Sequence, residues 1–435
     1  MKTKLFLLLT VLSIAVSCNL KGKRQIEGTS RHADWVYDAT IYEVNIRQYT
    51  KEGTFSAFEK HIPRLKELGV NILWIMSVQP IGKEGRKGTL GSYYSIRNYT
   101  QTNPEFGTLD DFKQLVNAAH NAGMKVILDW VANHTSHDAV WIAEHKDWYV
   151  TDSVGNVVSP YDWTDVAQLN YGNADMRKAM QEAMIFWLKE ANIDGFRCDM
   201  AGMVPVDFWE ATVDELKKVK PDIFMLAEAE EPALNVNAFD AYYAWEMHHK
   251  MNDIAQGKAN VNALRETLKK MSSFPDYAIP MYFTSNHDEN SWNGTEFERM
   301  GNAARTFAVL TCVLPGIPLI YNGQEVGFNR RLAFFEKDSI AWNDSDNFTA
   351  FYRSLIQLKK ENKALLSPEL GGKLEEIATS KPEEIFAIQR KAENNKLIAV
   401  FNLSPDTVAF TVENENLPPQ MQLSPWEYKI ITKEK

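Results

Sequence analysis

The sequence predicts an α/β fold in which eight short parallel strands alternate with helices and close into a barrel. Three observations support this prediction. Of the 435 residues, 45% are hydrophobic and 24% are charged, an ordinary globular balance with enough apolar material for one large core. From about residue 38, short apolar runs alternate with amphipathic stretches. Most of these runs are apolar at every position, as expected for parallel strands covered on both faces.

Eight runs have the length and composition of buried strands, and stretches between them carry apolar residues at helical spacing. An open sheet with helices on both faces is the alternative, but it would not usually need eight strand–helix units. The clearest helices are expected over Phe58–Leu68, Leu109–Ala122 and Ala174–Lys189. The expected strands are Ile41–Ile46, Val70–Ile75, Val126–Val131, Ile193–Cys198, Ile223–Ala227, Ala238–Ala244, Met281–Ser285 and Pro318–Tyr321.

Two departures from a plain barrel are expected. Residues 135–172, after the third strand, contain no clear helix and are too many for a simple loop, which predicts a short inserted subdomain. After a last helix at Phe348–Glu361, strand-like segments separated by turn residues predict an antiparallel β-sandwich domain over residues 365–435. The fold class is therefore a (β/α)8 TIM barrel over residues 34–364, with this insert and a C-terminal antiparallel β domain.

The N-terminus has the pattern of a secretion signal. Lys2 and Lys4 precede the apolar run Leu5–Val16, which is too short to span a bilayer permanently. The run ends in Ala15-Val16-Ser17-Cys18, which resembles a lipoprotein signal in which Cys18 is acylated after cleavage. A signal peptide cut beside an unmodified cysteine is the alternative. We expect residues 1–18 to be a lipoprotein signal peptide.

An acylated Cys18 would anchor the protein stably, since more than one acyl chain is needed for that and a lipoprotein carries several. Residues 19–33, rich in Lys, Arg, Gly and Ser, then form a tether. The expected location is the bacterial cell envelope, lipid-anchored at the outer membrane or the periplasmic face. Cys198 and Cys312 lie in apolar segments far apart in the sequence, and we expect both to be buried thiols.

The formal net charge of −10 argues against a nucleic-acid partner, which requires a basic surface. It fits an uncharged substrate. The 12 Trp, 16 Tyr and 22 Phe residues could supply flat stacking surfaces, although most of them are expected in the core.

Acidic residues lie at the C-terminal ends of four of the expected strands, where barrel enzymes place their chemistry. They are Asp129, Asp199, Glu228 and Asp288. A scaffold gains nothing from converging carboxylates, because like charges repel and their desolvation is costly. Helix capping is the alternative for any one of them, but not for all four.

Two carboxylates on adjacent strands suit glycoside hydrolysis, in which one attacks the anomeric carbon and the other protonates the leaving oxygen. Arg197 lies two residues before Asp199, and we expect its guanidinium to keep Asp199 ionised, as a nucleophile requires. The apolar approach Phe224–Ala227 is expected to raise the pKa of Glu228, as a proton donor requires.

Four motifs in order resemble the signatures of the α-amylase family of glycoside hydrolases, a retaining family built on a (β/α)8 barrel. The resemblance covers nearly all of the chain from about Trp35. Each motif is weak alone, but four in order, each at the end of its own strand, are highly specific. They are Asp129-Trp130-Val131-Ala132-Asn133-His134, Gly195-Phe196-Arg197-Cys198-Asp199, Met225-Leu226-Ala227-Glu228 and Ser285-Asn286-His287-Asp288.

The resemblance implies a role for each matched residue. Asp199 would be the nucleophile, Glu228 the general acid and then base, and Asp288 the residue that stabilises the transition state. The same resemblance implies that substrate is bound by Tyr94, His134, Arg197 and His287, and that Asp129 and Asn133 support the site.

The sequence departs from typical α-amylases after the nucleophile. They have a small residue followed by Lys-His, whereas this chain has Met200-Ala201-Gly202-Met203. The departure puts endo-acting starch specificity and a calcium site in doubt. We expect no cofactor to be required. Calcium is the one metal left open, with Asn133 as a candidate ligand. Asp152, Asp162 and Asp165 are candidate partners, or else solvated loop acids.

The sequence thus predicts a lipid-anchored retaining enzyme of starch degradation that cleaves α-1,4-glucosidic bonds in starch-like glucans or maltooligosaccharides. An α-glucosidase, an α-1,6-cleaving relative, a transglycosylase and a non-catalytic glucan-binding lipoprotein are the alternatives. Because the stretch 135–165 is short, we expect a cleft open at both ends and attack within chains. Trp163 and Trp292 are candidate stacking platforms.

Overall fold

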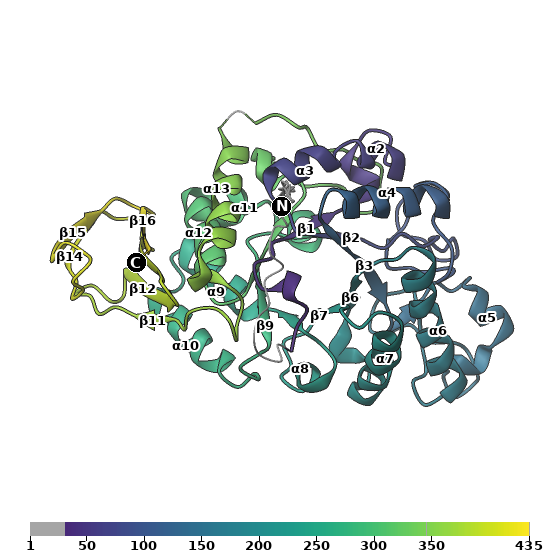
Figure 1. The fold of residues 1–435 in the computed structure, drawn as a ribbon. Helices are drawn as coiled ribbons and strands as arrows, with labels where there is room; N and C mark the ends of the chain where they lie inside the picture. Colours follow the sequence, from purple (N-terminus) through teal and green to yellow (C-terminus); the bar gives the residue numbers. More distant parts are fainter. Residues whose placement is uncertain (1–30, 345, 435) are drawn as a thin grey trace, which may run out of the picture. The chain divides into compact units, whose positions relative to one another are not determined.

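Eight parallel strands close into a barrel in the computed structural model, which describes residues 31–344 and 346–434 (Figure 1). The strand order around the barrel is β1-β10-β9-β8-β7-β6-β3-β2. The α/β barrel predicted from the sequence is confirmed, and each expected strand overlaps an observed one. The strands are β1 (Ile41–Val44), β2 (Ile72–Ile75), β3 (Lys125–Val131), β6 (Gly195–Asp199), β7 (Phe224–Ala227), β8 (Ala241–Tyr243), β9 (Ile279–Tyr282) and β10 (Ile317–Tyr321).

Alternate side chains along each strand point into the barrel, as the two-residue period of a strand requires. Near the N-terminal ends, buried apolar residues of several strands form one cluster that includes Ile41, Ile127 and Leu226. Two residues further along, the same alternation places the polar residues Glu43 and Asp129. The barrel interior therefore changes from apolar to polar toward the C-terminal ends of the strands.

Helices surround the strands in Figure 1 and supply the apolar outer layer. The helix expected over Phe58–Leu68 is wrong in one respect, because the structure has two shorter helices there, separated near His61. Pro63, in the first turn of the second helix, has no N–H to continue a single helix. The described helices before β6 are α1 (Ile46–Tyr49), α2 (Phe55–Glu59), α3 (Ile62–Leu68), α4 (Leu109–Asn121), α5 (Val140–Glu144) and α6 (Ala174–Glu190).

The remaining helices complete the outer layer, and the last of them has the expected bounds. Buried apolar residues such as Phe307, Leu310 and Leu355 form a second large cluster among the later of these helices. They are α7 (Val206–Val219), α8 (Leu234–Asn237), α9 (Trp245–Ala255), α10 (Val261–Met271), α11 (Glu296–Met300), α12 (Ala304–Val313) and α13 (Phe348–Glu361).

The insert after β3 is short, and it contains some regular structure that the sequence did not predict. Strands β4 (His134–Thr135) and β5 (Ala167–Gln168) pair antiparallel at its base. Between them lies the five-residue helix α5, where no clear helix was expected. The antiparallel pair brings the far end of the insert back to His134 at the barrel rim.

Two antiparallel sheets follow the barrel. One contains β11 (Glu375–Glu376), β12 (Ile385–Ala392), β13 (Asn395–Asn402) and β16 (Tyr428–Glu434), and the other β14 (Val408–Thr411) and β15 (Gln420–Leu423). Buried residues of both sheets, among them Val400 and Phe410, share one apolar cluster. The buried Arg390 donates hydrogen bonds to the carbonyls of Val313 and Leu314 at the end of α12. A charged side chain thus connects the C-terminal sheet domain to the barrel.

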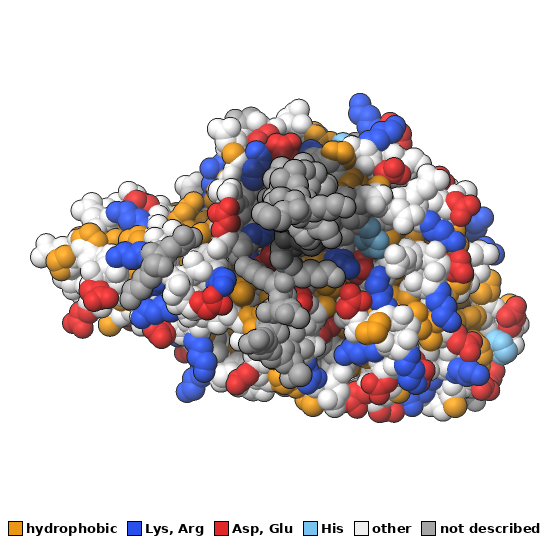
Figure 2. All heavy atoms as spheres, viewed as in Figure 1, with side chains coloured by type: hydrophobic (Ala, Val, Ile, Leu, Met, Phe, Trp, Pro, Cys, Tyr) orange, Lys and Arg blue, Asp and Glu red, His pale blue; other side chains and the backbone are white. Residues whose placement is uncertain are grey.

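The described part of the chain bears on one further expectation. Cys198 and Cys312 are buried free thiols, as predicted. Within residues 31–344 and 346–434, no helix is long and apolar enough to cross a membrane. The predicted signal peptide, Cys18 and most of the predicted tether lie outside the described residues. On the face shown in Figure 2, basic and acidic side chains are intermingled.

Candidate active site

The four acids predicted from the strand ends lie together at the C-terminal rim of the barrel. A cavity of about 300 Å³ opens there, and Asp199, Glu228 and Asp288 all line it. Asp129 lies beneath them, fully buried on the strand next to β6. Tyr94 and His134 line the same cavity. The structure therefore gathers residues from five separate segments into one site.

Arg197 is the centre of this arrangement. Its Nη1 lies 2.8 Å from Asp129 Oδ1 and 3.1 Å from Asp199 Oδ1, and its Nε donates to the hydroxyl of Tyr243 at 3.1 Å. Its Nη2 lies 2.8 Å from Glu228 Oε2, as an ion pair without the alignment of a hydrogen bond. One buried cation thus holds three carboxylates in fixed positions.

Burial raises the pKa of Asp199, and the charge of Glu228 raises it further, against the opposing effect of Arg197. Arg197 lowers the pKa of Asp199 in the expected direction, but burial and Glu228 outweigh it, so the net shift is upward. The reason is geometric, because the guanidinium is shared with Asp129 and Glu228. Burial also raises the pKa of Glu228, in the direction predicted. The charge of Glu228 disfavours a second ionised carboxylate at Asp199, so the two groups titrate as a coupled pair.

His287 connects Tyr94 and Asp288 to Glu43, which lies on β1 inside the barrel. Its Nδ1 lies 2.5 Å from Glu43 Oε1, and its Nε2 lies 2.7 Å from the Tyr94 hydroxyl and 3.3 Å from Asp288 Oδ2. Burial opposes the charged ring, but Asp288 and Glu43 outweigh it and raise the pKa of His287 well above its usual value. An imidazolium that donates through both nitrogens satisfies these contacts.

The Tyr94 hydroxyl completes this chain of contacts by donating to Asp129 Oδ2 at 3.0 Å. The Tyr94 ring stacks on the imidazole of His287, with ring centroids 5.4 Å apart. Glu43 was missed in the sequence, although a signal existed. It is the one charged residue within the strand Ile41–Val44, where every residue is fully buried.

His134 differs from His287, since burial lowers its pKa to about 4. It is therefore neutral at neutral pH and can offer a ring nitrogen to a sugar hydroxyl. The neighbouring Asn133 Nδ2 lies 3.3 Å from His134 Nδ1.

The candidate calcium ligands do not fit a calcium site. Asp165 Oδ1 pairs with Lys87 Nζ at 3.0 Å, and Asp152 accepts hydrogen bonds from the backbone of its own turn. Asp162 is exposed, and Asn133 directs its amide toward His134. Over residues 31–344 and 346–434, no group of three or more His, Cys, Asp or Glu side chains could hold a metal ion. Calcium binding requires six to eight converging oxygen ligands, which these residues do not provide.

Met200, directly after Asp199, adopts a left-handed backbone conformation with φ 45°. Such a conformation is strained for a side chain of this size, and it recurs at functional sites. Its N–H donates to Glu228 Oε2 at 2.9 Å, and its side chain lines the cavity. Met200 thus positions the second carboxylate through its backbone N–H.

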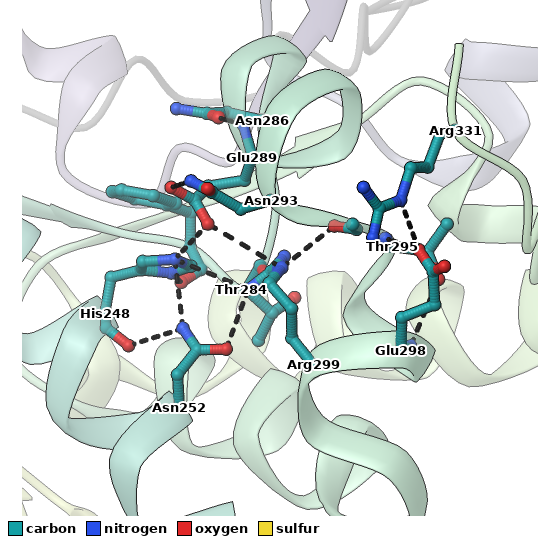
Figure 3. A network of polar contacts seen from close by, with 12 residues as sticks. His248, Asn252, Thr284, Asn286, Glu289, Asn293, Thr295, Glu298, Arg299 and Arg331 are labelled. Carbon is teal, nitrogen blue, oxygen red and sulfur yellow. Dashed lines mark hydrogen bonds and ion pairs between the residues drawn. The ribbon is translucent and has the colours of Figure 1, made fainter. Parts of the chain in front are cut away.

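The loop after β9, which carries His287 and Asp288, is fixed from below by a polar network (Figure 3). The Asn286 side chain accepts from the N–H of Glu289 at 2.8 Å, which begins a π-helical turn over Glu289–Asn293. Glu289 Oε2 lies 3.1 Å from His248 Nε2 and 3.6 Å from Arg299 Nε. The network holds this turn, and with it the residue Asp288 that precedes it.

Several cavity residues had no signal in the sequence. Lys87 comes from the loop after β2, and Phe334 and Phe335 come from the long loop after β10. Both predicted stacking platforms line the cavity, and Trp292 is 51% exposed whereas Trp163 is half-buried. The predicted residues Asp129, Arg197 and His287 lie directly beneath the cavity residues.

A family model described as "Alpha amylase, catalytic domain" matches residues 29–166 and 147–365 of the chain. The structure is similar to that of an α-amylase from Lactobacillus plantarum, with a TM-score of 0.82 and 29% identity over 91% of this chain and 98% of that one. It is also similar to a maltogenic α-amylase from Thermotoga neapolitana, with a TM-score of 0.81 and 27% identity over 91% and 96% of the two chains.

Two curated proteins with similar sequences are also named α-amylases. An α-amylase of Haloarcula japonica is 26% identical over 393 residues, which cover 86% of this chain and 57% of that protein. A maltogenic α-amylase of Bacillus acidopullulyticus is 26% identical over 388 residues, which cover 82% of this chain and 64% of that protein. The chain thus spans less than two thirds of the length of these two curated relatives.

Proposed function

Because the chain belongs to the α-amylase family of glycoside hydrolases, we propose that it hydrolyses α-1,4-glucosidic bonds in starch-like glucans or maltooligosaccharides with retention of configuration. The observation that carries the proposal is the shared position of Asp199 and Glu228 on the buried Arg197. Both carboxyls line the cavity, and burial raises the pKa of Glu228, as a proton donor requires. A retaining glycosidase needs such a pair, one ionised and one protonated.

In the first step, the protonated Glu228 gives its proton to the glycosidic oxygen while the ionised Asp199 attacks the anomeric carbon. The bond between the anomeric carbon and the leaving oxygen breaks, and a glycosyl ester forms on Asp199. In the second step, Glu228 takes a proton from water, and the resulting hydroxyl attacks the anomeric carbon. The ester bond breaks, so Asp199 is again ionised and Glu228 is again protonated.

The neighbouring residues support the positive charge that develops on the sugar. His287 lowers the pKa of Asp288, although burial alone would raise it, so Asp288 is ionised and can stabilise that charge. His134 lines the cavity and would bind a sugar hydroxyl, and Tyr94 offers a ring face at the cavity wall. His287 lies beneath the cavity and would act through its contacts with Tyr94 and Asp288. Arg197 orients both carboxylates, and Asp129 neutralises part of its charge.

The N-terminal sequence supports a second part of the proposal, that the enzyme is anchored in the bacterial cell envelope through lipid on Cys18. The support is the order of Lys2 and Lys4, the apolar run Leu5–Val16 and the motif that ends at Cys18. With the anchor, a cleft enzyme would act on glucans that reach the membrane surface.

The experiment for the reaction is proton NMR of the first products from maltoheptaose, with pullulan and isomaltose as comparison substrates. Retention predicts that the new reducing end appears first as the α-anomer and then mutarotates. Cleavage of maltoheptaose with an initial β-anomer would contradict the double displacement. Cleavage of isomaltose but not maltoheptaose would contradict the α-1,4 specificity.

A further inference from the structure

The cavity has a wall on the side away from Glu228. This wall is built from the loop after β2, which contributes Lys87, and the loop after β10, which contributes Phe334 and Phe335. We propose that this wall makes the site a pocket for a single terminal glucose, so that the enzyme removes glucose from the non-reducing ends of maltooligosaccharides. The inference rests on the proposed function and specifies its substrate.

The direction of the wall follows from the strand order. Glu228 follows β7, and in the closed barrel β1 lies four strands from β7 in either direction. The strands β2 and β10 flank β1 on both sides, so their loops face Glu228 across the cavity. The proton donor faces the leaving group, which is attached to the anomeric carbon. The 4-hydroxyl, on the opposite side of the sugar ring, therefore points toward these two loops.

The two loops are joined where they meet. The N–H of Leu90 donates to the carbonyl of Phe335 at 3.0 Å, and the N–H of Thr89 donates to Glu336 Oε1 at 3.0 Å. Gly88 has φ +63°, and a Cβ there would lie 2.5 Å from Phe335 Cβ. Only glycine allows this approach, so the loops meet without room for a glucan chain between them at this point.

The wall is also supported from beneath. The buried Arg47, on α1, donates to the carbonyl of Gly91 at 3.0 Å and to that of Leu90 at 3.2 Å. Its guanidinium lies over the ring of Tyr93, 4.3 Å from the ring centroid. An always-charged side chain with these partners holds the tip of the loop in place.

A second contact extends the wall toward the insert after β3. Lys87 Nζ pairs with Asp165 Oδ1 at 3.0 Å, and the Ser95 hydroxyl donates to the Asp165 carbonyl at 2.9 Å. The side chains of Lys87 and Asp165 both line the cavity, and they offer a donor and an acceptor to sugar hydroxyls. Phe334 lines the same cavity, and its ring stacks on that of Tyr94 with 6.3 Å between the ring centroids.

The size of the cavity agrees with a short ligand. Its volume of about 300 Å³ lies at the lower end of the range of about 300–1,000 Å³ that small-molecule pockets occupy. The sequence predicted a cleft open at both ends because the insert 135–165 is short. That reasoning considered only the loop after β3, whereas the wall comes from the loops after β2 and β10.

The test uses maltoheptaose labelled at its reducing end, with a free or a 4,6-O-benzylidene-blocked non-reducing end. We expect glucose and labelled maltohexaose as the first products from the free substrate, and loss of cleavage of the blocked one. Equal cleavage of both substrates, or unlabelled maltose or longer unlabelled fragments as the first products, would overturn the pocket. An aryl α-glucoside, assayed in parallel, reports on the proposed function. If the enzyme cleaved none of these substrates, the proposed function itself would be refuted.

Removing the wall should change the products. In the double variant Lys87→Ala/Phe335→Ala, we expect cleavage of the blocked substrate and release of unlabelled fragments longer than glucose. Lys83→Ala is the matched control, because Lys83 is exposed in the same loop and does not line the cavity. It should keep the wild-type products. If the double variant cleaved the aryl glucoside but still rejected the blocked substrate, the side chains of Lys87 and Phe335 would not close the pocket, and that part of the proposal would be overturned. If the double variant failed to fold, cleavage of the free and the blocked maltoheptaose by the wild-type enzyme would still decide whether the site is a closed pocket.

Discussion

Glu43 on β1 lies directly beneath His287, with Glu43 Oε1 2.5 Å from His287 Nδ1. Both side chains are buried, and 244 residues separate them in the sequence. Burial raises the pKa of Glu43, and the carboxylates of Asp288 and Glu43 raise that of His287. The proton of this pair is therefore held to a pH above the usual range of histidine. The other ring nitrogen then stays a donor toward Tyr94 and Asp288.

Glu43→Gln should narrow the pH range of activity from the alkaline side. The raised pKa keeps His287 charged as pH rises, and loss of the Glu43 charge lowers that pKa, so the charge is lost at lower pH. We expect the alkaline limb of kcat/KM to move to lower pH while the acid limb changes less. The exposed Asp162→Asn is the control and should leave the profile unchanged. An unshifted alkaline limb in Glu43→Gln would show that the pair does not control the protonation of His287.

The barrel could be predicted because its signals are local. Each strand is a short run of buried residues, and the helix Phe348–Glu361 was predicted with the bounds that the structure shows. The break between the two helices near His61 was not predicted, because the apolar pattern continues across it and only Pro63 marks the start of a new helix. The helix α5 has no buried residue, so no apolar periodicity marks it.

The site could be predicted only where chemistry follows a strand. Asp199 and Glu228 do so, and their motifs placed them in one cavity. The wall could not be predicted, since Lys87 and Phe335 lie in irregular loops that meet through backbone hydrogen bonds. The raised pKa of Asp199 could not be predicted either, because the sequence does not show that three carboxylates share the guanidinium of Arg197.

Cys18→Ala should release the protein from membranes. The expected reason is the loss of every acyl chain, since a stable anchor needs more than one. Fractionation of cells followed by immunoblotting measures the distribution between membrane and soluble fractions. Ser17→Ala keeps the cysteine and a small residue before it, so it should remain in the membrane fraction. If Cys18→Ala stayed with the membrane, the lipoprotein assignment would be incorrect.

Asp199→Asn should lower kcat by at least about 10³-fold, because a carboxamide cannot form the glycosyl ester. The fold should survive. The pKa of Asp199 is raised, which means that its ionised form is unfavourable in the folded state, so a neutral isostere should keep or raise the Tm at neutral pH. Turnover of an aryl α-glucoside and a thermal melt measure the two effects. A variant with near wild-type kcat would assign the nucleophile to another residue, and one with a much lower Tm would indicate a structural role.

Glu228→Gln should discriminate between substrates by their leaving groups. The glutamine can still accept from the N–H of Met200, so the loop after β6 should keep its position. It cannot donate a proton, and cleavage of maltooligosaccharides should fall by at least about 10²-fold, the usual size of general acid catalysis. The dinitrophenolate of a dinitrophenyl α-glucoside needs no proton to depart, so the burst phase of this substrate should persist, while attack by water on the ester should stay slow.

Azide, which needs no general base, should restore turnover of the Glu228→Gln variant and give an α-glucosyl azide as product. Rapid-mix kinetics on both substrates measure the difference. An equal loss on the aryl glucoside and on maltoheptaose, with no azide rescue, would mean that Glu228 supports the site structurally and that the proton comes from another group.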